Sequence, residues 1–372
     1  MKKLMALLLA LTLALGLLCA CAANPTESTD PSGEKPAKVY KVCNLVNGNL
    51  GDKSFYDSAQ SGLDALKAAG RIESTTIEMG GTDADQPKWL STLYEVSEGK
   101  QYDLIICGTW QMPEYLAEVA AKYPEQKYLI YDSECDLPNV VSLNYKQNDM
   151  GYLVGVFAAC MTTDTSVKNI NADAVLGFVG GEDSPVINDF LYGFILGAQS
   201  VNQNIRIDTR YTGGYVDTAL AKEYALSMIN DNKCDIIWGV AGNAGNGAAE
   251  AALETGKAWF IGVDSDQELT FSEELAAITL TSGLKNIGQS LVWFFDEWDA
   301  GRGHFGENLL LGIAEGGVGI VTDKNFKSYA SAETVKKVEE ARKGVLDGTI
   351  KVPTAIGNES KDLENLRESV RP

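Results

Sequence analysis

The stretch that decides the fold is residues 39–70, VYKVCNLVNGNLGDKSFYDSAQSGLDALKAAG. Its opening segment, 39–46, is a nearly continuous apolar run of the length expected for a buried strand. After a glycine-containing turn, four apolar residues recur at helical spacing, namely Phe55, Ala59, Leu63 and Leu66. Asp52 or Ser54 is expected to cap this helix and Gly70 to end it. The stretch therefore predicts a strand–turn–helix unit.

The same alternation continues along the chain. Further strands are expected at 104–107, 128–131, 174–179, 236–240, 259–263 and 277–280, and helices at 115–122, 150–161, 186–201 and 248–254. Strands that alternate with helices are typical of βαβ units and parallel sheets. About ten strands exceed one compact sheet, which favours an α/β fold of two doubly wound domains. Such sheets bind ligands beyond the carboxyl ends of their strands, so functional side chains should follow the strands.

Composition narrows the possible partners. The 372 residues include 31 Lys and Arg against 51 Asp and Glu, a net charge of −20. A chain of this charge repels phosphate backbones, which argues against a nucleic-acid partner. Its single histidine, His304, excludes metal sites that need several histidines. The fractions of hydrophobic (45%) and charged (22%) residues are those of a folded globular protein.

The N-terminus has the features of an export signal. Two lysines precede the apolar run 4–18, which is too short for a comfortable transmembrane helix. The sequence Leu18-Cys19-Ala20-Cys21 that follows resembles a bacterial lipobox, which implies a signal peptide at 1–20 and a lipid on Cys21. An ordinary cleaved signal with a chance cysteine is the alternative. Residues 21–37 are rich in Pro, Ser and Thr and are expected to be a flexible tether to the extracytoplasmic face of the cell membrane.

Other motif matches argue against catalysis. The segment 301–306 matches GxGxxG but follows a predicted helix, so we interpret it as a turn and not as a dinucleotide site. The five cysteines beyond the signal form no CxxC pair and are expected to be buried free thiols: Cys43, Cys107, Cys135, Cys160 and Cys234. No catalytic, metal or cofactor constellation is recognisable, and we expect a protein that is not an enzyme.

Five ordered motifs resemble those of the basic membrane protein family, a group of purine-nucleoside-binding lipoproteins. They are NGNLGDKSF at 47–55, YDS at 131–133, GFVGG at 177–181 with the helix after it, AGNAGNG at 241–247 and IGVDSDQ at 261–267. The resemblance continues through 281–286 and 316–319 and covers roughly 38–325. Asn47 stands where the family has Asp, and Gly51, Tyr56 and Ala244 are further departures.

The resemblance implies a type I periplasmic-binding-protein fold, in which two Rossmann-like lobes are joined by a hinge of three crossings. With that topology the N-lobe would comprise 38–145 plus 284–322, and the C-lobe 146–283 plus 323–372. The ligand would be held between the lobes.

A nucleoside has a flat base and a ribose with vicinal hydroxyls, so its site needs aromatic faces and carboxylates or amides. By resemblance, Asp264 and Lys285 serve the ribose, with a purely structural ion pair as the alternative. Asp132 would accept a hydrogen bond from the base or the sugar, unless it only caps a turn. Asn47 can donate as well as accept, so the ligand edge that it contacts stays open.

Four aromatic residues are candidates for stacking on the base. By resemblance, Phe55 is the stacking residue, with core packing as the alternative because it also begins an apolar helix face. Trp110 and Trp238 could supply the second face, and Phe190 is a weaker candidate on an apolar helix. Gly242 would present its backbone to the ligand.

We therefore expect a lipid-anchored, monomeric solute-binding protein that delivers a purine nucleoside to the permease and ATPase of an ABC importer. The alternatives are the same fold with a sugar or other metabolite as ligand, for uptake or sensing, and an enzyme that acts on nucleosides.

Overall fold

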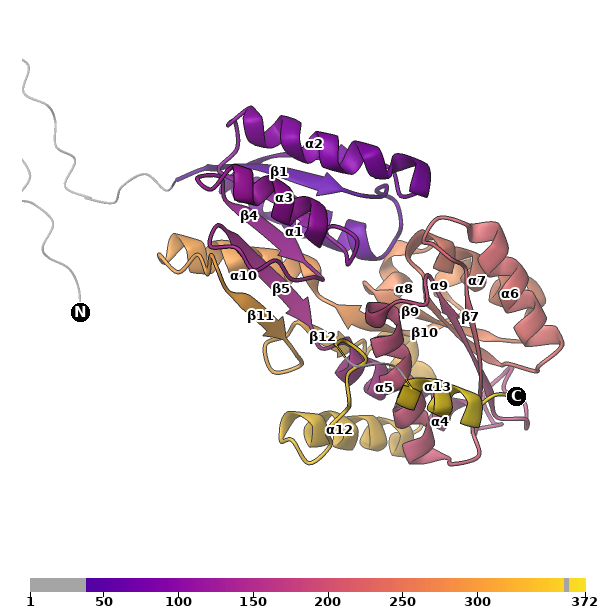
Figure 1. The fold of residues 1–372 in the computed structure, drawn as a ribbon. Coiled ribbons are helices and arrows are strands. Elements are labelled where there is room, and N and C mark those ends of the chain that lie inside the picture. Colours follow the sequence, from indigo (N-terminus) through magenta and orange to yellow (C-terminus); the bar gives the residue numbers. More distant parts are fainter. Residues whose placement is uncertain (1–37, 358–360) are drawn as a thin grey trace, which may run out of the picture. The chain divides into compact units, whose positions relative to one another are not determined.

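The computed structural model describes residues 38–357 and 361–372, so the predicted signal peptide (1–20), Cys21 and the predicted tether (21–37) lie outside the described residues. The described residues form two six-stranded sheets flanked by helices (Figure 1). We call each sheet with its helices a lobe. The predicted α/β fold with two doubly wound lobes is confirmed.

The N-lobe contains the sheet with strand order β11-β5-β4-β3-β1-β2, in which all neighbours are parallel. Its strands are β1 (Tyr40–Val46), β2 (Ile72–Glu78), β3 (Leu104–Gly108), β4 (Tyr128–Tyr131), β5 (Val140–Tyr145) and β11 (Asn308–Leu311). Its helices are α1 (Phe55–Ala68), the short η1 (Asp83–Asp85), α2 (Gln86–Glu98), α3 (Pro113–Lys122) and α10 (Ile287–Asp299). Val42 packs in the cluster with α1 and α10, whereas Cys43 and Leu45 pack in the cluster with α2 and α3. Both faces of the sheet are therefore covered, as its apolar strands require.

The C-lobe contains the sheet β12-β10-β9-β8-β6-β7, which is parallel except for β12. Its strands are β6 (Val175–Gly180), β7 (Arg206–Tyr211), β8 (Ile236–Val240), β9 (Trp259–Asp264), β10 (Thr279–Lys285) and β12 (Val318–Ile320). Its helices are α4 (Gln147–Thr162), α5 (Pro185–Val201), α6 (Thr218–Asn230), η2 (Gly242–Ala244), α7 (Gly245–Thr255), α8 (Gln267–Thr270), α9 (Glu273–Ala276), α11 (Lys324–Tyr329), α12 (Ala332–Leu346) and α13 (Lys361–Ser369). Helices α4 and α5 pack on one face of the sheet, and α6 and α7 on the other.

The chain passes between the sheets three times, from β5 to α4, from β10 to α10 and from β11 to β12. Strand β12 pairs antiparallel with β10 in the C-lobe sheet, although the predicted segment 284–322 assigned it to the N-lobe. The backbone of Val318–Ile320 pairs with Gly283–Lys285, which places the third crossing before β12.

Most predicted elements lie within a few residues of their observed bounds. The strand expected at 277–280 instead spans Thr279–Lys285, because the chain before it forms α9, which Ser272 caps. The GxGxxG segment is a turn between α10 and β11, as expected. The five cysteines of the described residues are buried and free.

Candidate functional site

A cavity of about 230 Å³ lies between the lobes, and we call it the interlobe cavity. Residues of both lobes line it. Eight of the nine residues predicted for ligand binding are among them: Asn47, Phe55, Trp110, Asp132, Phe190, Gly242, Asp264 and Lys285. Asn47, Asp132, Asp264 and Lys285 end a strand or directly follow one, and Trp110 and Gly242 lie two residues after one. This is the edge where open parallel sheets hold ligands.

One end of the cavity is charged. Lys285 ends β10 and is 1% exposed, and its Nζ lies 2.5 Å from Oδ1 of Asp132 in the N-lobe. Asp264 ends β9, and its Oδ2 accepts a hydrogen bond of 2.9 Å from the Ser54 hydroxyl. Among the described lining residues, Lys285 is the only cation beside three carboxylates, of Asp52, Asp132 and Asp264. This end can accept several hydrogen bonds from a ligand rich in hydroxyl groups.

Burial changes the protonation of these carboxylates. Burial raises the pKa of Asp264 to about 7, and the Lys285 ammonium and the Ser54 hydroxyl oppose the rise. Burial also raises the pKa of Asp132, again opposed by Lys285. A buried carboxylate favours its neutral form unless partners compensate for lost hydration. The charge of the cavity therefore depends on pH near neutrality.

Aromatic rings surround the ammonium group. The Nζ of Lys285 lies 4.6 Å from the ring centre of Phe190 and 5.8 Å from that of Phe55. The Phe55 ring lies edge-on to Tyr56, with ring centres 5.2 Å apart. Such aromatic faces stabilise a desolvated cation and offer apolar surface to a flat ligand. The expected stacking candidates Phe55 and Phe190 thus come from opposite lobes to the same cavity.

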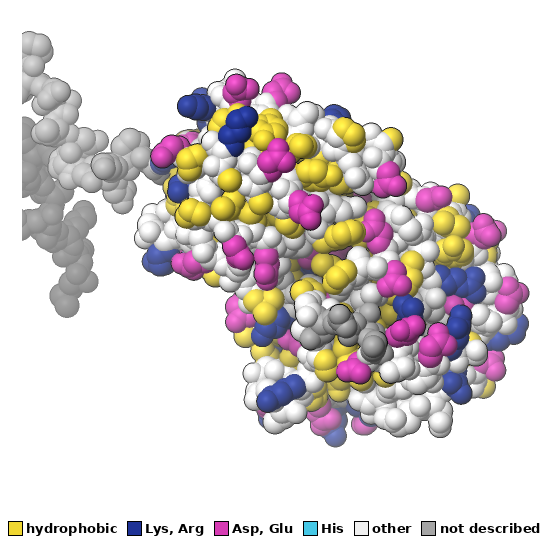
Figure 2. Space-filling model, in the orientation of Figure 1, with side chains coloured by type: hydrophobic (Ala, Val, Ile, Leu, Met, Phe, Trp, Pro, Cys, Tyr) yellow, Lys and Arg dark blue, Asp and Glu magenta, His cyan; other side chains and the backbone are white. Residues whose placement is uncertain are grey.

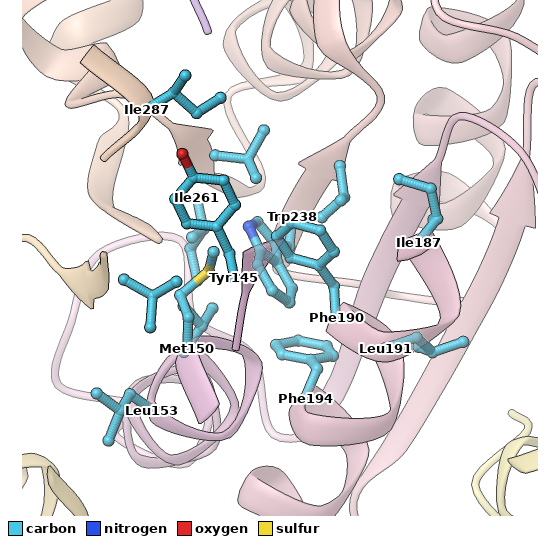
Figure 3. Close-up of a cluster of buried hydrophobic side chains, with 14 of the residues drawn as sticks. Tyr145, Met150, Leu153, Ile187, Phe190, Leu191, Phe194, Trp238, Ile261 and Ile287 are labelled. Carbon is cyan, nitrogen blue, oxygen red and sulfur yellow. The ribbon is translucent and has the colours of Figure 1, made fainter. Parts of the chain in front are cut away.

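Trp238 does not line the interlobe cavity. It lies inside β8, is fully buried, and donates from Nε1 to the carbonyl of Gly262 at 3.0 Å. Figure 3 shows its indole among core side chains that include Phe190 and Phe194. The Trp238 side chain lies on the face of the sheet that α4 and α5 cover. It therefore packs against Phe190 in the core and does not face the cavity.

The other end of the cavity is polar and uncharged. The Nδ2 of Asn47 donates to Oγ1 of Thr109 at 2.8 Å and to Oε1 of Gln111 at 3.3 Å. The Tyr56 hydroxyl donates to the Asn47 carbonyl at 2.9 Å. Both amide protons of Asn47 therefore have partners. Its Oδ1 lies 3.3 Å from the Tyr56 hydroxyl and is the side-chain atom that can accept a further hydrogen bond from a ligand.

Several lining residues were not predicted. They include Tyr56, Gln111, Tyr215 and Asn243, together with the capping Asp52. Tyr56 and Gln111 directly follow the predicted Phe55 and Trp110, so their position next to predicted residues was the available signal. Tyr215 lies in the loop after β7, where two glycines precede it and no motif marks it.

The loop before α1 links the lobes. The Asp52 carboxylate accepts hydrogen bonds from the backbone N–H groups of Ser54, Tyr56 and Asp57, at 3.0, 2.9 and 3.1 Å. Asp52 thus caps α1, which leaves the Ser54 hydroxyl free to reach Asp264 of the C-lobe. The cap holds Phe55 at the start of the helix and therefore at the cavity.

The described ranges contain neither a membrane-spanning helix nor a metal site. In residues 38–357 and 361–372, no helix is long and apolar enough to cross a membrane. The same part of the chain has no group of three or more His, Cys, Asp and Glu side chains arranged to hold a metal ion.

Comparisons with known proteins agree with this architecture. A family model described as "ABC transporter substrate-binding protein PnrA-like" matches residues 39–355. The "CD4+ T-cell-stimulating antigen" of Listeria monocytogenes is 30% identical, with 95% of this chain and 99% of the relative covered. The "ABC transporter nucleoside-binding protein BmpA" of Lactococcus lactis is 28% identical, with 95% and 100% covered.

A third relative is "Basic membrane protein A" of Borreliella burgdorferi, 27% identical, with 91% of this chain and 95% of the relative covered. Among solved structures, an ABC transporter solute-binding protein from Aeropyrum pernix has a TM-score of 0.79 and 26% identity, with 89% of this chain and 98% of that chain covered. The family and this structural neighbour are solute-binding proteins and not enzymes. The chain belongs to the Bmp family of PnrA-like ABC transporter substrate-binding proteins.

Proposed function

We propose that this protein binds a purine nucleoside in the interlobe cavity and delivers it to an ABC importer. The observation that carries the proposal is the meeting of Asp132, Asp264 and Lys285 with the rings of Phe55 and Phe190. A ribose offers vicinal hydroxyls to the carboxylates, and a flat base offers two faces to the aromatic rings. The name of the Lactococcus lactis relative, a nucleoside-binding protein, supports the same ligand class.

We assign the ribose to the charged end, to Asp264, Asp132 and Lys285. The base would lie between the aromatic rings with its polar edge toward Asn47 and the exposed Trp110. Gly242 lies just after strand β8 and has a φ of 53°. It would present its backbone to the ligand. The uncharged amide of Asn47, in place of the family's Asp, would accept a hydrogen bond without adding a fourth negative charge.

Charge argues for a nucleoside and against its phosphorylated forms. The chain has a net charge of −20, and Figure 2 shows Asp and Glu side chains spread over both lobes on the visible face. The lining holds three carboxylates and one ammonium, and each carboxylate that is ionised beyond the one paired with Lys285 would repel an added phosphate. We therefore expect nucleosides to bind more tightly than the corresponding 5′-monophosphates.

Isothermal titration calorimetry tests the ligand class. The purified protein is titrated with adenosine, guanosine, inosine, cytidine, uridine, ribose, glucose and galactose, and recovered ligand is analysed for chemical change. Binding of purine nucleosides without conversion supports the proposal. Binding of a free sugar alone would favour the sugar-receptor alternative, and conversion of the nucleoside would favour an enzyme.

Delivery to an importer requires the protein to stay at the membrane. We propose a lipid on Cys21 and an extracytoplasmic location, with the protein acting as a monomer beside the permease and ATPase subunits. Several acyl chains on one cysteine would anchor the protein firmly, whereas one chain alone binds marginally. Cell fractionation of C21A should show release into the soluble fraction, with C19A as the matched control that keeps membrane retention.

A further inference from the structure

The turn between β6 and α5 reaches across the cavity to the N-lobe. In this turn, Oε1 of Glu182 accepts a hydrogen bond from Nε2 of Gln111 at 3.4 Å. Burial raises the pKa of Glu182, and the side chain of Trp110 beside it opposes the rise. Gln111 and Trp110 both line the cavity, and Trp110 is 40% exposed. Glu182 is therefore a C-lobe group that holds the N-lobe at the exposed edge of the site.

The next residue ties the same turn to the C-lobe. The Asp183 carboxylate accepts from Nδ2 of Asn188 at 2.7 Å and from Nη1 of Arg367 at 3.4 Å. The Tyr211 hydroxyl donates to Oδ1 of Asn188 at 2.6 Å. Nη1 of Arg367 also lies 3.4 Å from that hydroxyl, and its guanidinium carbon is 5.8 Å from the Tyr211 ring centre. Arg367 thus completes a ring of four side chains that supports the turn.

Arg367 comes from a part of the chain that lies beyond the family match, which ends at residue 355. It lies on α13, whose position is fixed by buried Leu363 and by Val370, which follows the helix (3% and 0% exposed). The Val370 carbonyl accepts from the backbone N–H of Ile207 at 2.7 Å, at the edge strand β7. Figure 1 shows α13 beside α5, the helix that the turn precedes. The terminal helix is therefore anchored independently of Asp183.

We propose that α13, through Arg367, positions the Glu182–Asp183 turn so that Glu182 meets Gln111 when the lobes enclose a ligand. The hydrogen bonds of Arg367 go to Asp183 and Tyr211, which do not line the interlobe cavity, so Arg367 is a positioning residue and not a ligand-binding one. Asp183 has a half-exposed side chain. Without Arg367, it keeps Asn188 as a partner but loses the cation that fixes the turn from the outside. The experiments that measure inosine binding depend on the proposed function, whereas the hydrogen-exchange experiment does not.

The first test needs no ligand. In the full-length protein, hydrogen exchange is measured at the backbone amides of 181–184 and 186–188 for R367A and for R371A. Arg371 is the matched control, because its side chain is exposed and, within the described residues, pairs with Glu368 of the same segment and not with the turn. R367A should exchange about tenfold faster in 181–184, since local opening depends on such contacts. R371A should match the parent, and unchanged exchange in R367A would overturn the proposal.

The second test uses inosine as the probe. In R367A, the dissociation rate of inosine should rise about three- to tenfold with an unchanged association rate, because the contact forms after encounter. The D183N variant removes the charge partner of Arg367 and leaves α13 docked, so it should raise the dissociation rate in the same way. It replaces R367A in this experiment if R367A folds poorly. Melting temperatures of all variants show whether the folded state is kept.

A double-mutant cycle separates positioning from a general structural effect. If Arg367 acts through Glu182, the loss of inosine affinity in the double variant E182A/R367A should be smaller than the product of the two single losses. Fully multiplicative losses would contradict the proposal. If the parent binds no nucleoside at all, the proposed function fails, and hydrogen exchange still decides the role of Arg367.

Discussion

At the scale of single residues, the site is built from strained backbone at strand ends. Thr109, Asp132 and Asp264 all have positive φ, at 79°, 62° and 64°. Residues other than glycine rarely adopt this conformation, and such strain gathers at ligand sites. Each residue ends or follows a strand, so the bend turns its side chain away from the sheet and toward the cavity.

Asp264 is expected to contribute more to affinity than any single aromatic ring. If it accepts two ribose hydroxyls, D264A leaves buried donors of the ligand unpaired. Charge-assisted hydrogen bonds contribute about 1.5–3 kcal/mol each, so nucleoside affinity should fall by roughly two orders of magnitude or more. Loss of one ring in F55A should cost less, about 0.5–1.5 kcal/mol plus lost apolar area. Calorimetry measures both.

The 2′-deoxynucleoside provides the matched ligand for this prediction. It should bind the parent much more weakly than the ribonucleoside does, and should lose little more in D264A, as an energetic coupling requires. A folded D264A protein that binds nucleosides like the parent would show that Asp264 is structural and that the ribose assignment is wrong.

The pKa of Asp264 predicts opposite effects of pH on stability and binding. Its pKa is raised to about 7 in the folded protein, so the folded state holds a proton that the unfolded state releases. The contribution of Asp264 to the free energy of unfolding should therefore decrease as pH rises from about 4 to about 7. Nucleoside affinity should rise over the upper part of this range, because only the ionised carboxylate accepts two hydroxyls.

Asp235 offers a control for the pH experiment. Burial raises its pKa to about 7 as well, but its carboxylate is held by the Thr162 hydroxyl, and Asp235 does not line the cavity. Denaturation and calorimetry from pH 5 to pH 8 should show that D264N and D235N each reduce the pH dependence of stability. Only D264N should reduce the pH dependence of binding. An equal change in D235N binding would contradict the assignment.

Sequence reasoning located strand-end residues well, because the carboxyl ends of parallel strands share one edge. It wrongly placed Trp238 at the ligand: this residue is the third of β8, and its side chain packs in the hydrophobic core on one face of the sheet. It also could not show that Ser54 reaches Asp264, since the two residues are 210 positions apart in the sequence. Cross-lobe partners depend on how two separately folded sheets meet, which no local pattern records.

At the scale of elements, the C-lobe depends on the close approach of α4 and α5. A Cβ at Gly193 would lie 2.0 Å from the backbone oxygen of Asn148. G193A should therefore force the helices apart and lower the free energy of unfolding by about 1–3 kcal/mol, measured by urea denaturation. G319A is the control, because no atom lies within 4 Å of a Cβ there; its effect should stay within about 0.5 kcal/mol. Equal effects would argue against close helix packing.

Strands and helices with continuous apolar runs were predictable from the sequence, whereas elements without such runs were less predictable. Strand β2 (IESTTIE) is mostly half-buried or exposed and has no apolar run, yet it pairs with β1 along its whole length. Its strand conformation comes from this pairing and not from its own pattern. Lys285 was expected after a strand, but it ends β10, because pairing with β9 and β12 extends that strand. Pairing with neighbouring strands thus determines the bounds of β2 and β10, which strand propensity alone does not predict.

At the scale of the whole described body, hydrogen bonds already cross between the lobes. The Ser54 hydroxyl donates to Asp264, the Ser265 hydroxyl donates to the Ser54 carbonyl at 2.8 Å, and Gln111 donates to Glu182. Asp264 and Gln111 line the interlobe cavity, so the first and the third of these bonds lie at the site itself. A ligand that contacts both lobes adds to these bonds, and it can shift the equilibrium only by its preference for the closed arrangement.

We therefore expect the lobes to close on the ligand, with a measurable fall in the radius of gyration. Small-angle X-ray scattering with and without saturating nucleoside should show the decrease, and the melting temperature should rise because only the folded protein binds. S54A removes a cross-lobe donor but leaves the Asp52 cap on α1, so the variant should stay folded, be larger than the parent without ligand, and need more nucleoside to close. S61A, on the exposed part of α1, is its control and should behave like the parent. Identical scattering profiles of the parent with and without ligand would contradict a hinged receptor, even if binding were tight.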